Sequence, residues 1–312
     1  MGSRRKSFNK KTVFLSSAIV AALIFSVIIS LNFDFLPDWD SIFKNANLSV
    51  QSIEVPDDPL TVHFIDVGQG DCILIKYESC NILIDSGEKE NADTVTDYLD
   101  YQGIRALDYV IATHPHSDHI GSMPDVFEEF DVHNVLIPRL TQKNVPSTKT
   151  YENLLACISA SGAKASYAIV GEKYKVGEIS FEILAPSEQY EDLNNMSVVI
   201  RLDFGDTSFL FTGDAQRESE EAMLKIRADL DVDVLKAGHH GSRYSNTPEF
   251  LEAVSPKLTI VSCGKNNTYG HPHDETLQRL KNAGSEILRT DLAGTIIIGS
   301  DGEKLCAVCE KY

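Results

Sequence analysis

The sequence has few basic residues, and this shortage limits what the protein can bind. Lys and Arg make up 28 of the 312 residues, against 46 Asp and Glu, and the formal net charge is −18 at pH 7. A net charge of this sign repels nucleic acids and other polyanions at long range. The composition therefore excludes a broad basic nucleic-acid-binding surface. Any phosphopolymer that the protein uses must be held by a local site.

A recognisable serine nucleophile is also missing. The sequence contains no Gly-x-Ser-x-Gly motif, the strand-to-helix turn that presents a catalytic serine in many hydrolases. A covalent serine mechanism is therefore disfavoured.

Cysteines are few, and we expect them to be structural thiols. Disulfides would be permitted outside a membrane, but a domain of this size can bury an adequate core without them. Two of the cysteines, Cys306 and Cys309, lie in an alternating, strand-like run in which positions three apart point to opposite faces. The other cysteines are Cys72, Cys80, Cys157 and Cys263.

The N-terminal region contains a long apolar run without a cleavage motif. Residues 13–32 carry no charge and are long enough to cross a bilayer as a helix, and the residues before them include basic but no acidic side chains. The positive-inside rule then keeps residues 1–12 in the cytoplasm and places the rest of the chain outside the cell. Because no Ala-x-Ala pattern follows the run, we expect an uncleaved signal anchor in the cell membrane. A cleaved signal peptide is the alternative.

After the span, residues 33–58 lack a sustained period and are predicted to be a tether, and residues 59–312 form one domain in which strand-like and helical patterns alternate. The strand-like segments are 60–66, 72–77, 81–85, 109–112, 134–137, 179–184, 197–202, 208–211, 232–235, 258–262 and 295–298, and the helical ones are 93–101, 150–161, 217–228, 248–254 and 275–282. Glu78 and Ser79 predict a hairpin turn. Two sheets flanked by helices would bury these segments and gather the polar loops at one edge.

One hexapeptide concentrates metal-binding residue types. Residues 114–119 are His-Pro-His-Ser-Asp-His and follow an apolar, strand-like run. Three imidazoles and a carboxylate within six residues are hard to place in an apolar core, and together they suit zinc or a neighbouring divalent metal. One short loop cannot complete two coordination spheres, so further ligands must come from distant parts of the chain. A solvated histidine cluster in a turn is the alternative.

Two other apolar segments end in residues of the same kind. Asp214 follows Ser-Phe-Leu-Phe-Thr-Gly, and His239 and His240 follow Asp-Val-Leu-Lys-Ala-Gly. Asp214 alone is more readily explained as a turn residue. Three strand ends that each present a metal-type ligand are harder to explain by core packing. We therefore expect the three segments to form one metal centre.

Together with several further segments, these residues resemble the metallo-β-lactamase-fold hydrolases, and among them the extracellular domain of ComEC-like DNA-uptake proteins. The further segments are Phe64-Ile-Asp-Val-Gly-Gln-Gly-Asp71, Leu83-Ile-Asp-Ser-Gly87, Asn194-Asn-Met-Ser197 and Tyr269-Gly-His-Pro272. The likeness runs from about Leu60 to the C-terminus. It implies an α/β protein, an αββα sandwich with two divalent metal ions at one edge of the strands. The metal would be zinc, with manganese as the alternative.

The resemblance also implies which residues bind the two ions. The first ion would be bound by His114 and His116, and the second by Asp118, His119 and His240. Asp214 would bridge the two ions. His239 is expected to support His240. Many family members place a third histidine at the first ion, whereas this chain has Asn195 at the matching place. A neutral amide is a weaker ligand than imidazole, so the first ion would exchange more readily.

Three other residues receive roles from the same resemblance. Asp85 is expected to hydrogen-bond the ligand loop, and a plain turn role is the alternative. Asp66 lies beside the glycines 68 and 70 and is either close to the metals or part of a turn. His271 resembles a substrate-facing position of the family and would donate a proton to the leaving group, so Asp118 and His271 are the predicted catalytic residues. A histidine that stabilises its loop is the alternative for His271.

The predicted chemistry is hydrolysis by a hydroxide that the two ions share, because such ions lower the pKa of a water molecule from about 15.7 toward about 7. The resemblance favours a phosphodiesterase or nuclease that acts on DNA or another external phosphopolymer. A β-lactam or thioester hydrolase is the alternative among enzymes. A domain that binds DNA or a wall polymer without turnover is the alternative outside them. One span cannot form an uptake channel, so a role in DNA uptake would require partners.

The predicted anchor can be tested on intact cells. Protease added outside the cells should digest the domain, and the domain should stay with the membrane fraction after washing, because a helix of this length and apolarity inserts stably. Protection of the domain in intact cells would reverse the predicted orientation. Release of the domain into the medium would indicate a cleaved signal peptide.

Overall fold

The computed structural model of the chain describes residues 55–311. The predicted cytoplasmic tail and membrane anchor, and the predicted tether up to residue 54, lie outside these residues and stay predictions. Within residues 55–311, no helix is both long enough and apolar enough to cross a membrane.

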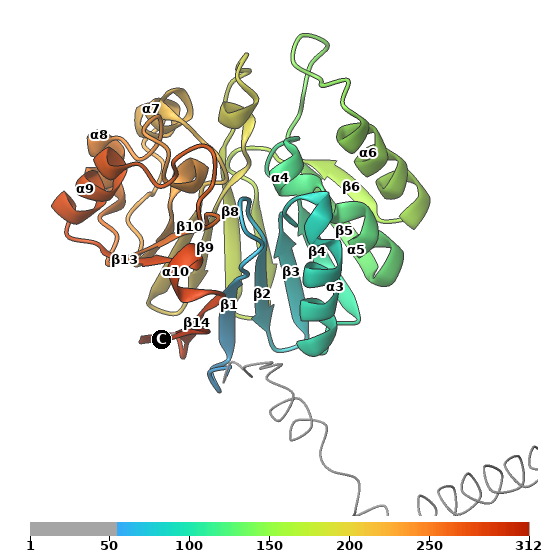
Figure 1. Ribbon diagram of the computed structural model, residues 1–312, viewed down its shortest axis with the longest axis horizontal. Helices are drawn as coiled ribbons and strands as arrows, with labels where there is room; N and C mark the ends of the chain where they lie inside the picture. Colours follow the sequence, from blue (N-terminus) through green and yellow to red (C-terminus); the bar gives the residue numbers. More distant parts are fainter. Residues whose placement is uncertain (1–54, 312) are drawn as a thin grey trace, which may run out of the picture. The chain divides into compact units, whose positions relative to one another are not determined.

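Two β-sheets form the centre of the described region (Figure 1). In chain order the strands are β1 (Leu60–Phe64), β2 (Ile73–Tyr77), β3 (Cys80–Ile84), β4 (Ala106–Ile111), β5 (Asp131–Ile137), β6 (Lys164–Tyr167), β7 (Lys173–Val176), β8 (Ile179–Ala185), β9 (Val199–Phe204), β10 (Thr207–Phe211), β11 (Val234–Lys236), β12 (Leu258–Val261), β13 (Glu286–Arg289), β14 (Ile296–Ser300) and β15 (Leu305–Cys309). The first sheet has the order β15-β14-β1-β2-β3-β4-β5-β6, and the second has the order β13-β12-β11-β10-β9-β8-β7.

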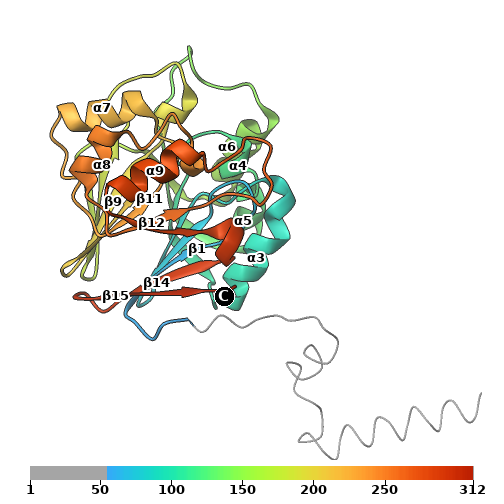
Figure 2. The same cartoon turned by 60° about the vertical axis from the view of Figure 1, so that its left-hand side comes forward.

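Helices cover the outer face of each sheet, as Figures 1 and 2 show from two directions. Along the first sheet lie α3 (Ala92–Tyr101), α4 (Ser117–Ile120), α5 (Met123–Glu129) and α6 (Lys149–Ser161), and along the second lie α7 (Arg217–Lys225), α8 (Pro248–Val254) and α9 (Asp274–Asn282). A short helix, α10 (Thr290–Ala293), links β13 to β14, and the 3-10 turns are η2 (Lys89–Asn91), η3 (Leu193–Met196) and η4 (Gly238–Gly241). The predicted αββα sandwich is confirmed.

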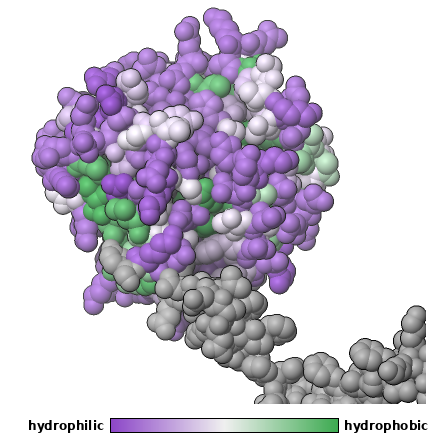
Figure 3. Space-filling view, in the orientation of Figure 1, coloured by the Kyte–Doolittle hydropathy of each residue, from purple (hydrophilic) through white to green (hydrophobic). Residues whose placement is uncertain are grey.

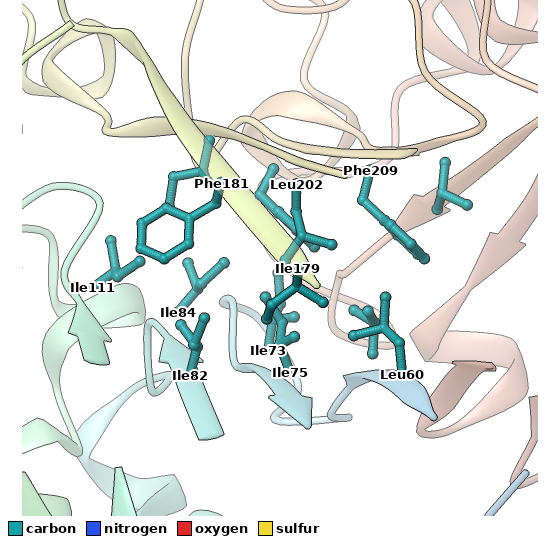
Figure 4. Packing of buried hydrophobic residues seen from close by; sticks show 14 of the residues in the cluster. Leu60, Ile73, Ile75, Ile82, Ile84, Ile111, Ile179, Phe181, Leu202 and Phe209 are labelled. Carbon is teal, nitrogen blue, oxygen red and sulfur yellow. The ribbon is translucent and has the colours of Figure 1, made fainter. Parts of the chain in front are cut away.

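The central strands of both sheets are buried on both faces. Side chains alternate along a strand, so Ile73 and Ile75 of β2 lie in the cluster between the sheets, whereas Leu74 packs with the helices outside. Figure 4 shows side chains of the second sheet, such as Phe181 and Phe209, facing the isoleucines of the first. Burial on both faces explains why these strands appear in the sequence as almost continuous apolar runs.

The strands that the sequence pattern missed lie at sheet edges. β6 ends the first sheet, and β7 and β13 are the two ends of the second. An edge strand is half exposed and carries polar residues, so it lacks the apolar run that marks a central strand. In β7, for example, exposed lysines alternate with half-buried Tyr174 and Val176. The helices predicted at 93–101, 150–161, 248–254 and 275–282 are confirmed to within one residue, whereas α7 ends three residues before the predicted Ala228.

The surface differs sharply from this interior. Figure 3 shows hydrophilic residues over most of the visible face, with apolar residues in small, separate patches. Cys72, Cys80 and Cys263 are buried thiols, as predicted. The fold thus keeps its apolar residues between the layers and leaves its acidic composition on the outside.

The sheets gather the predicted ligands at one edge. In the first sheet, β3 and β4 are parallel, and Asp85 and His114 follow their carboxyl ends. In the second, β10 and β11 are parallel, and Asp214 and His239 follow theirs. Loops at the carboxyl ends of parallel strands share one side of a sheet, where ligands commonly bind in α/β folds.

Candidate metal centre

Four predicted ligands from three separate segments come together at this edge. Ligand atoms of Asp118, His119, Asp214 and His240 all lie within 4.8 Å of one another. Nε2 of His119 lies 3.2 Å from Asp214 Oδ1, and Nε2 of His240 lies 3.4 Å from the same oxygen. His240 Nε2 also lies 3.3 Å from Asp118 Oδ2. This set corresponds to the predicted second metal site.

The two carboxylate oxygens of Asp214 face different groups. Whereas Oδ1 faces the set above, Oδ2 lies 3.8 Å from His114 Nε2 and 3.6 Å from His239 Nε2. His114 Nε2 in turn lies 3.0 Å from His116 Nδ1. A carboxylate that bridges two cations needs one oxygen for each cation, and Asp214 has this arrangement. His239 lies on the side of the first predicted site, opposite His240.

Hydrogen bonds orient two of the imidazoles. His119 Nδ1 donates to Asp85 Oδ2 at 2.7 Å, and the Thr113 hydroxyl donates to the same oxygen at 2.7 Å. Because this bond uses the only hydroxyl hydrogen of Thr113, its oxygen can accept from His114 Nδ1, 3.1 Å away, and the Ser197 hydroxyl lies 3.3 Å from the same nitrogen. With a hydrogen on Nδ1, each imidazole presents the lone pair of Nε2 toward Asp214. Asp85 orients both of them.

The third imidazole is oriented by the segment that follows β12. His240 Nδ1 lies 3.0 Å from the carbonyl oxygen of Ser262, which can only accept, so Nε2 is again left with its lone pair. His239 and His240 have φ angles of 51° and 53°, in the left-handed region that residues other than glycine rarely adopt. Asn246 holds this strained turn by two hydrogen bonds of 3.0 Å to the backbone of Gly238.

The converging atoms have no hydrogen-bond partners among the described residues. His119 Nε2, His240 Nε2 and Asp214 Oδ1 are all buried and unpaired. Buried polar atoms without partners are rare and costly in folded proteins. Lone pairs of imidazole and carboxylate that point to one small volume fit a divalent transition metal ion.

The carboxylates of the site also favour positive charge on the groups beside them. Burial lowers the pKa of His240, but Asp214 and Asp71 outweigh it and raise that pKa to about 10. Burial also lowers the pKa of His119, but Asp214 and Asp85 outweigh it and raise this pKa above its usual value. The pKa of Asp214 is held well below its usual range, because His240 and His119 outweigh burial. Protons and metal ions therefore compete for these atoms.

Two of the tentative site residues have other partners. Asp66 Oδ1 accepts from the backbone of Gly68 at 3.2 Å and its Oδ2 pairs with Lys311 at 3.2 Å, so Asp66 forms a turn. Asn195 Oδ1 accepts backbone N–H groups at the start of α7, at 3.0 and 3.3 Å. The preceding residue, Asn194, lines the pocket at the centre and has a side-chain oxygen without a hydrogen bond among the described residues. Of the two adjacent amides, Asn194 lines the pocket and Asn195 hydrogen-bonds the start of α7.

Sequence reasoning missed an ion pair beneath the centre. Lys236 and Asp71 are both buried and lie 2.6 Å apart, and Asp71 contacts His240. Asp71 is the last residue of the glycine-rich segment noted above. Lys236 is a charged residue within an otherwise apolar strand, next to a ligand loop, and this was the signal that could have found it.

A pocket of about 480 Å³ opens onto the centre. Its walls combine the predicted ligands with residues of five further segments: Gln69, Glu88, Pro115, His116, Ser117, Asp118, Thr148, Thr150, Asn194, Asp214, His239, His240, Tyr269 and His271. His271 and Tyr269 lie on one loop, with ring centroids 5.7 Å apart and planes inclined by 21°. A substrate can therefore reach the candidate ligands from solvent.

The fold and this site define a known class of protein. Residues 65–265 match the family model described as the metallo-beta-lactamase superfamily. The chain belongs to that superfamily.

Within the superfamily, the chain matches competence proteins of the ComEC-like group. It is 32% identical over 254 residues to ComE operon protein 3 of Bacillus subtilis (strain 168), covering 75% of this chain and 32% of that protein. It is 30% identical over 267 residues to competence protein ComA of Neisseria gonorrhoeae, covering 85% of this chain and 36% of that protein. The chain thus spans about a third of the length of these curated relatives. The predicted resemblance to this group is confirmed.

Solved structures support the fold. CmlA, a diiron beta-hydroxylase from Streptomyces venezuelae, superimposes with a TM-score of 0.52 at 16% sequence identity, over 75% of this chain and 53% of that chain. At this identity the likeness concerns the sandwich and not the reaction.

The arrangement of Asp214 predicts how metal binding depends on it. The chain purified without chelator should carry close to two transition-metal ions, and Asp214→Ala should remove most of both, because each oxygen faces one group of ligands. Elemental analysis of the purified proteins measures this. Asp66→Ala, which removes a carboxylate outside the centre, should keep both ions. Wild-type protein without metal, or Asp214→Ala protein that retains both ions, would contradict the assignment.

Proposed function

We propose that the chain is a metal-dependent phosphodiesterase that acts on DNA or another phosphopolymer. The observation that carries this proposal is the convergence of imidazoles on both oxygens of Asp214, with unpaired imidazole nitrogens at Oδ1, at the floor of an open pocket. Sites that hold two cations a few ångströms apart are suited to displacement at phosphorus, because both the attacking and the leaving oxygen need stabilisation.

The residues divide between two positions for metal ions. His114 and His116 would hold the first ion with Asp214 Oδ2, and the second would be held by Asp214 Oδ1 with Asp118, His119 and His240. When bound, such ions lower the pKa of a water molecule and offset the negative charge that develops on the phosphate. The mixture of imidazole and carboxylate suits zinc, with manganese as the alternative.

His271 is better suited to binding the substrate than to donating a proton. Burial, together with His240 and His239, lowers the pKa of His271 to about 4. An imidazole that is neutral near pH 7 does not hold the extra proton that a general acid transfers. It can still donate one hydrogen bond from its ring, and its place on the pocket wall directs that bond toward a substrate oxygen.

Tyr269 favours a substrate that contains bases. Its side chain is 65% exposed although it lines the pocket, and it stacks on His271. Exposed aromatic faces bind unpaired bases by stacking, worth about 1–3 kcal/mol per base. A polymer without bases, such as a teichoic-acid-like chain, gains nothing from such a face. We therefore favour single-stranded nucleic acid among the phosphopolymers.

An assay panel separates this proposal from its alternatives. DNA, bis(nitrophenyl) phosphate, nitrocefin and a thioester should be tested on protein of known metal content, and the proposal expects turnover of the first two. Turnover of nitrocefin or the thioester alone would replace it by the β-lactam or thioester hydrolase alternative. Metal binding without turnover of any substrate would indicate a DNA- or polymer-binding domain.

The place of action follows from the predicted anchor and is also part of the proposal. With residues 13–32 as a span, the hydrolase domain would work outside the cell at the membrane surface. The relatives named above are competence proteins, but the chain corresponds to about a third of their length.

Replacement of His271 tests its role on two kinds of ester. His271→Ala should lower kcat/KM about 10-fold or more for both nitrophenyl and alkyl phosphodiesters, because a lost hydrogen bond to the substrate does not depend on the leaving group. Steady-state kinetics on both substrates measure the ratio. His133→Ala, at an exposed histidine of β5, is the control. A loss confined to the alkyl ester would show that His271 donates a proton.

Replacement of Tyr269 tests the preference for bases. Tyr269→Ala should lower kcat/KM for single-stranded DNA about 10-fold, the effect of losing one stacked base, and should leave hydrolysis of a glycerol phosphate oligomer unchanged. Tyr269→Phe should keep the wild-type rates because it retains the aromatic face. Tyr244 is 63% exposed and lies outside the pocket lining, so Tyr244→Ala is a matched control. Equal losses on both polymers, or no loss on DNA, would refute the stacking role.

A further inference from the structure

A fully buried lysine lies directly beside the metal centre. Lys236 is the last residue of β11 and has no exposed surface. Its ammonium nitrogen lies 2.6 Å from Asp71 Oδ2 and 2.9 Å from the carbonyl oxygen of Ala237. Lysine is almost never fully buried unless it is paired, because removing its charge from water is costly. Such a charge at this place needs an explanation beyond packing.

Asp71 connects this lysine to the candidate ligands. Its Oδ1 lies 3.4 Å from His240 Nδ1, and its Oδ2 lies 4.0 Å from His119 Nδ1. Its backbone N–H donates to the carbonyl oxygen of Asp118 at 3.2 Å. Besides Asp214, the side chains proposed to hold the second ion are Asp118, His119 and His240. Asp71 therefore contacts the segments that carry all three. Its side-chain contacts are charge contacts, since Asp71 Oδ1 has no hydrogen-bond partner among the described residues, and they reach the imidazoles on the nitrogen that faces away from the metal position.

Lys236 also pairs with one member of a second group of candidate metal ligands. Asp71, Asp85 and His119 form a second group whose ligand atoms lie within 4.8 Å of one another and which could itself hold a metal ion. The ammonium group of Lys236 already supplies positive charge to Asp71. Unlike a metal ion, this charge cannot be exchanged or removed by a chelator, so Asp71 remains paired whether or not the centre is loaded.

We propose that Lys236 is a built-in cation that fixes Asp71 and, through Asp71, holds His240 in position for the second metal ion. Lys236 contacts neither the proposed ligand atoms of the centre nor the pocket, so it is a positioning residue. The inference rests on the proposed metal centre. Without the ammonium group, the Asp71 carboxylate is free to turn toward the imidazoles or toward the metal position, and His240 Nδ1 keeps only its contact with the carbonyl oxygen of Ser262.

Cobalt(II) titration of the metal-free chain tests this inference. The visible absorbance of bound Co²⁺ reports each ion separately from catalysis. Lys236→Met keeps the length of the side chain and removes its charge. It should weaken binding of one of the two Co²⁺ ions about 10-fold or more, the usual effect of losing a partner of a metal ligand, and leave the other ion unchanged. The melting temperature of its metal-free form should also fall, because Asp71 is left buried and unpaired.

The double variant Lys236→Met/Asp71→Asn separates positioning from stability. It removes both charges, so the melting temperature of its metal-free form should recover. Its binding of the affected Co²⁺ ion should stay weak, because no carboxylate orients His240. Recovery of both properties would reduce the pair to a structural ion pair and overturn the proposal. Because the double variant contains no unpaired charge, it remains informative if Lys236→Met fails to fold.

A surface pair provides the matched control. Lys257 pairs with Asp233 at 2.7 Å, but its side chain is largely exposed. Lys257→Met should change neither the melting temperature nor Co²⁺ binding, because an exposed ion pair contributes little. Wild-type protein that binds no Co²⁺ would remove the metal centre and the proposed function together. Wild-type protein that binds two ions, with unchanged affinities in Lys236→Met, would overturn only the role of Lys236.

Discussion

The structure depends on the crowding of four carboxylates at one edge of the sandwich. Asp71, Asp85 and Asp214 are buried and Asp118 is half-buried, and all four lie around His119. Like charges repel strongly where water is excluded, and each carboxylate also loses its hydration. Such a cluster is stable only if hydrogen-bond donors and positive charges are supplied within a few ångströms.

Residues of both sheets take part in this charge compensation. Asp71, Asp85 and Asp118 lie in loops of the first sheet, whereas Lys236, Asp214 and His240 lie on the second. The pair of Lys236 with Asp71 and the contacts of Asp214 with His119 therefore cross from one sheet to the other. Charge compensation at the centre and apolar packing between the sheets stabilise the same interface. Metal binding and the stability of the sandwich are consequently linked.

The sequence predicted the parts of this arrangement that are local. One hexapeptide contains His114, His116, Asp118 and His119, so the ligand segments could be predicted from the sequence. Central strands appear as apolar runs, so the sandwich could be predicted as well. Side-chain direction could not. Asn194 and Asn195 are adjacent and chemically identical, and only the turn of η3 decides that Asn194 faces the pocket while Asn195 caps α7. Edge strands such as β7 escaped because half-exposed strands lack a distinctive pattern.

Lys236 shows why buried charge is the hardest feature to predict. At the end of a short strand, a lysine is ordinarily expected to reach solvent. Here β11 lies between β10 and β12, which close over both sides, and the side chain ends against Asp71 of the other sheet. The floor of the pocket is thus determined by charge balance across two sheets, whereas Tyr269 and His271 on its wall belong to a loop without such constraints. Changes on that wall would alter binding of the proposed substrate without disturbing the atoms proposed to hold metal.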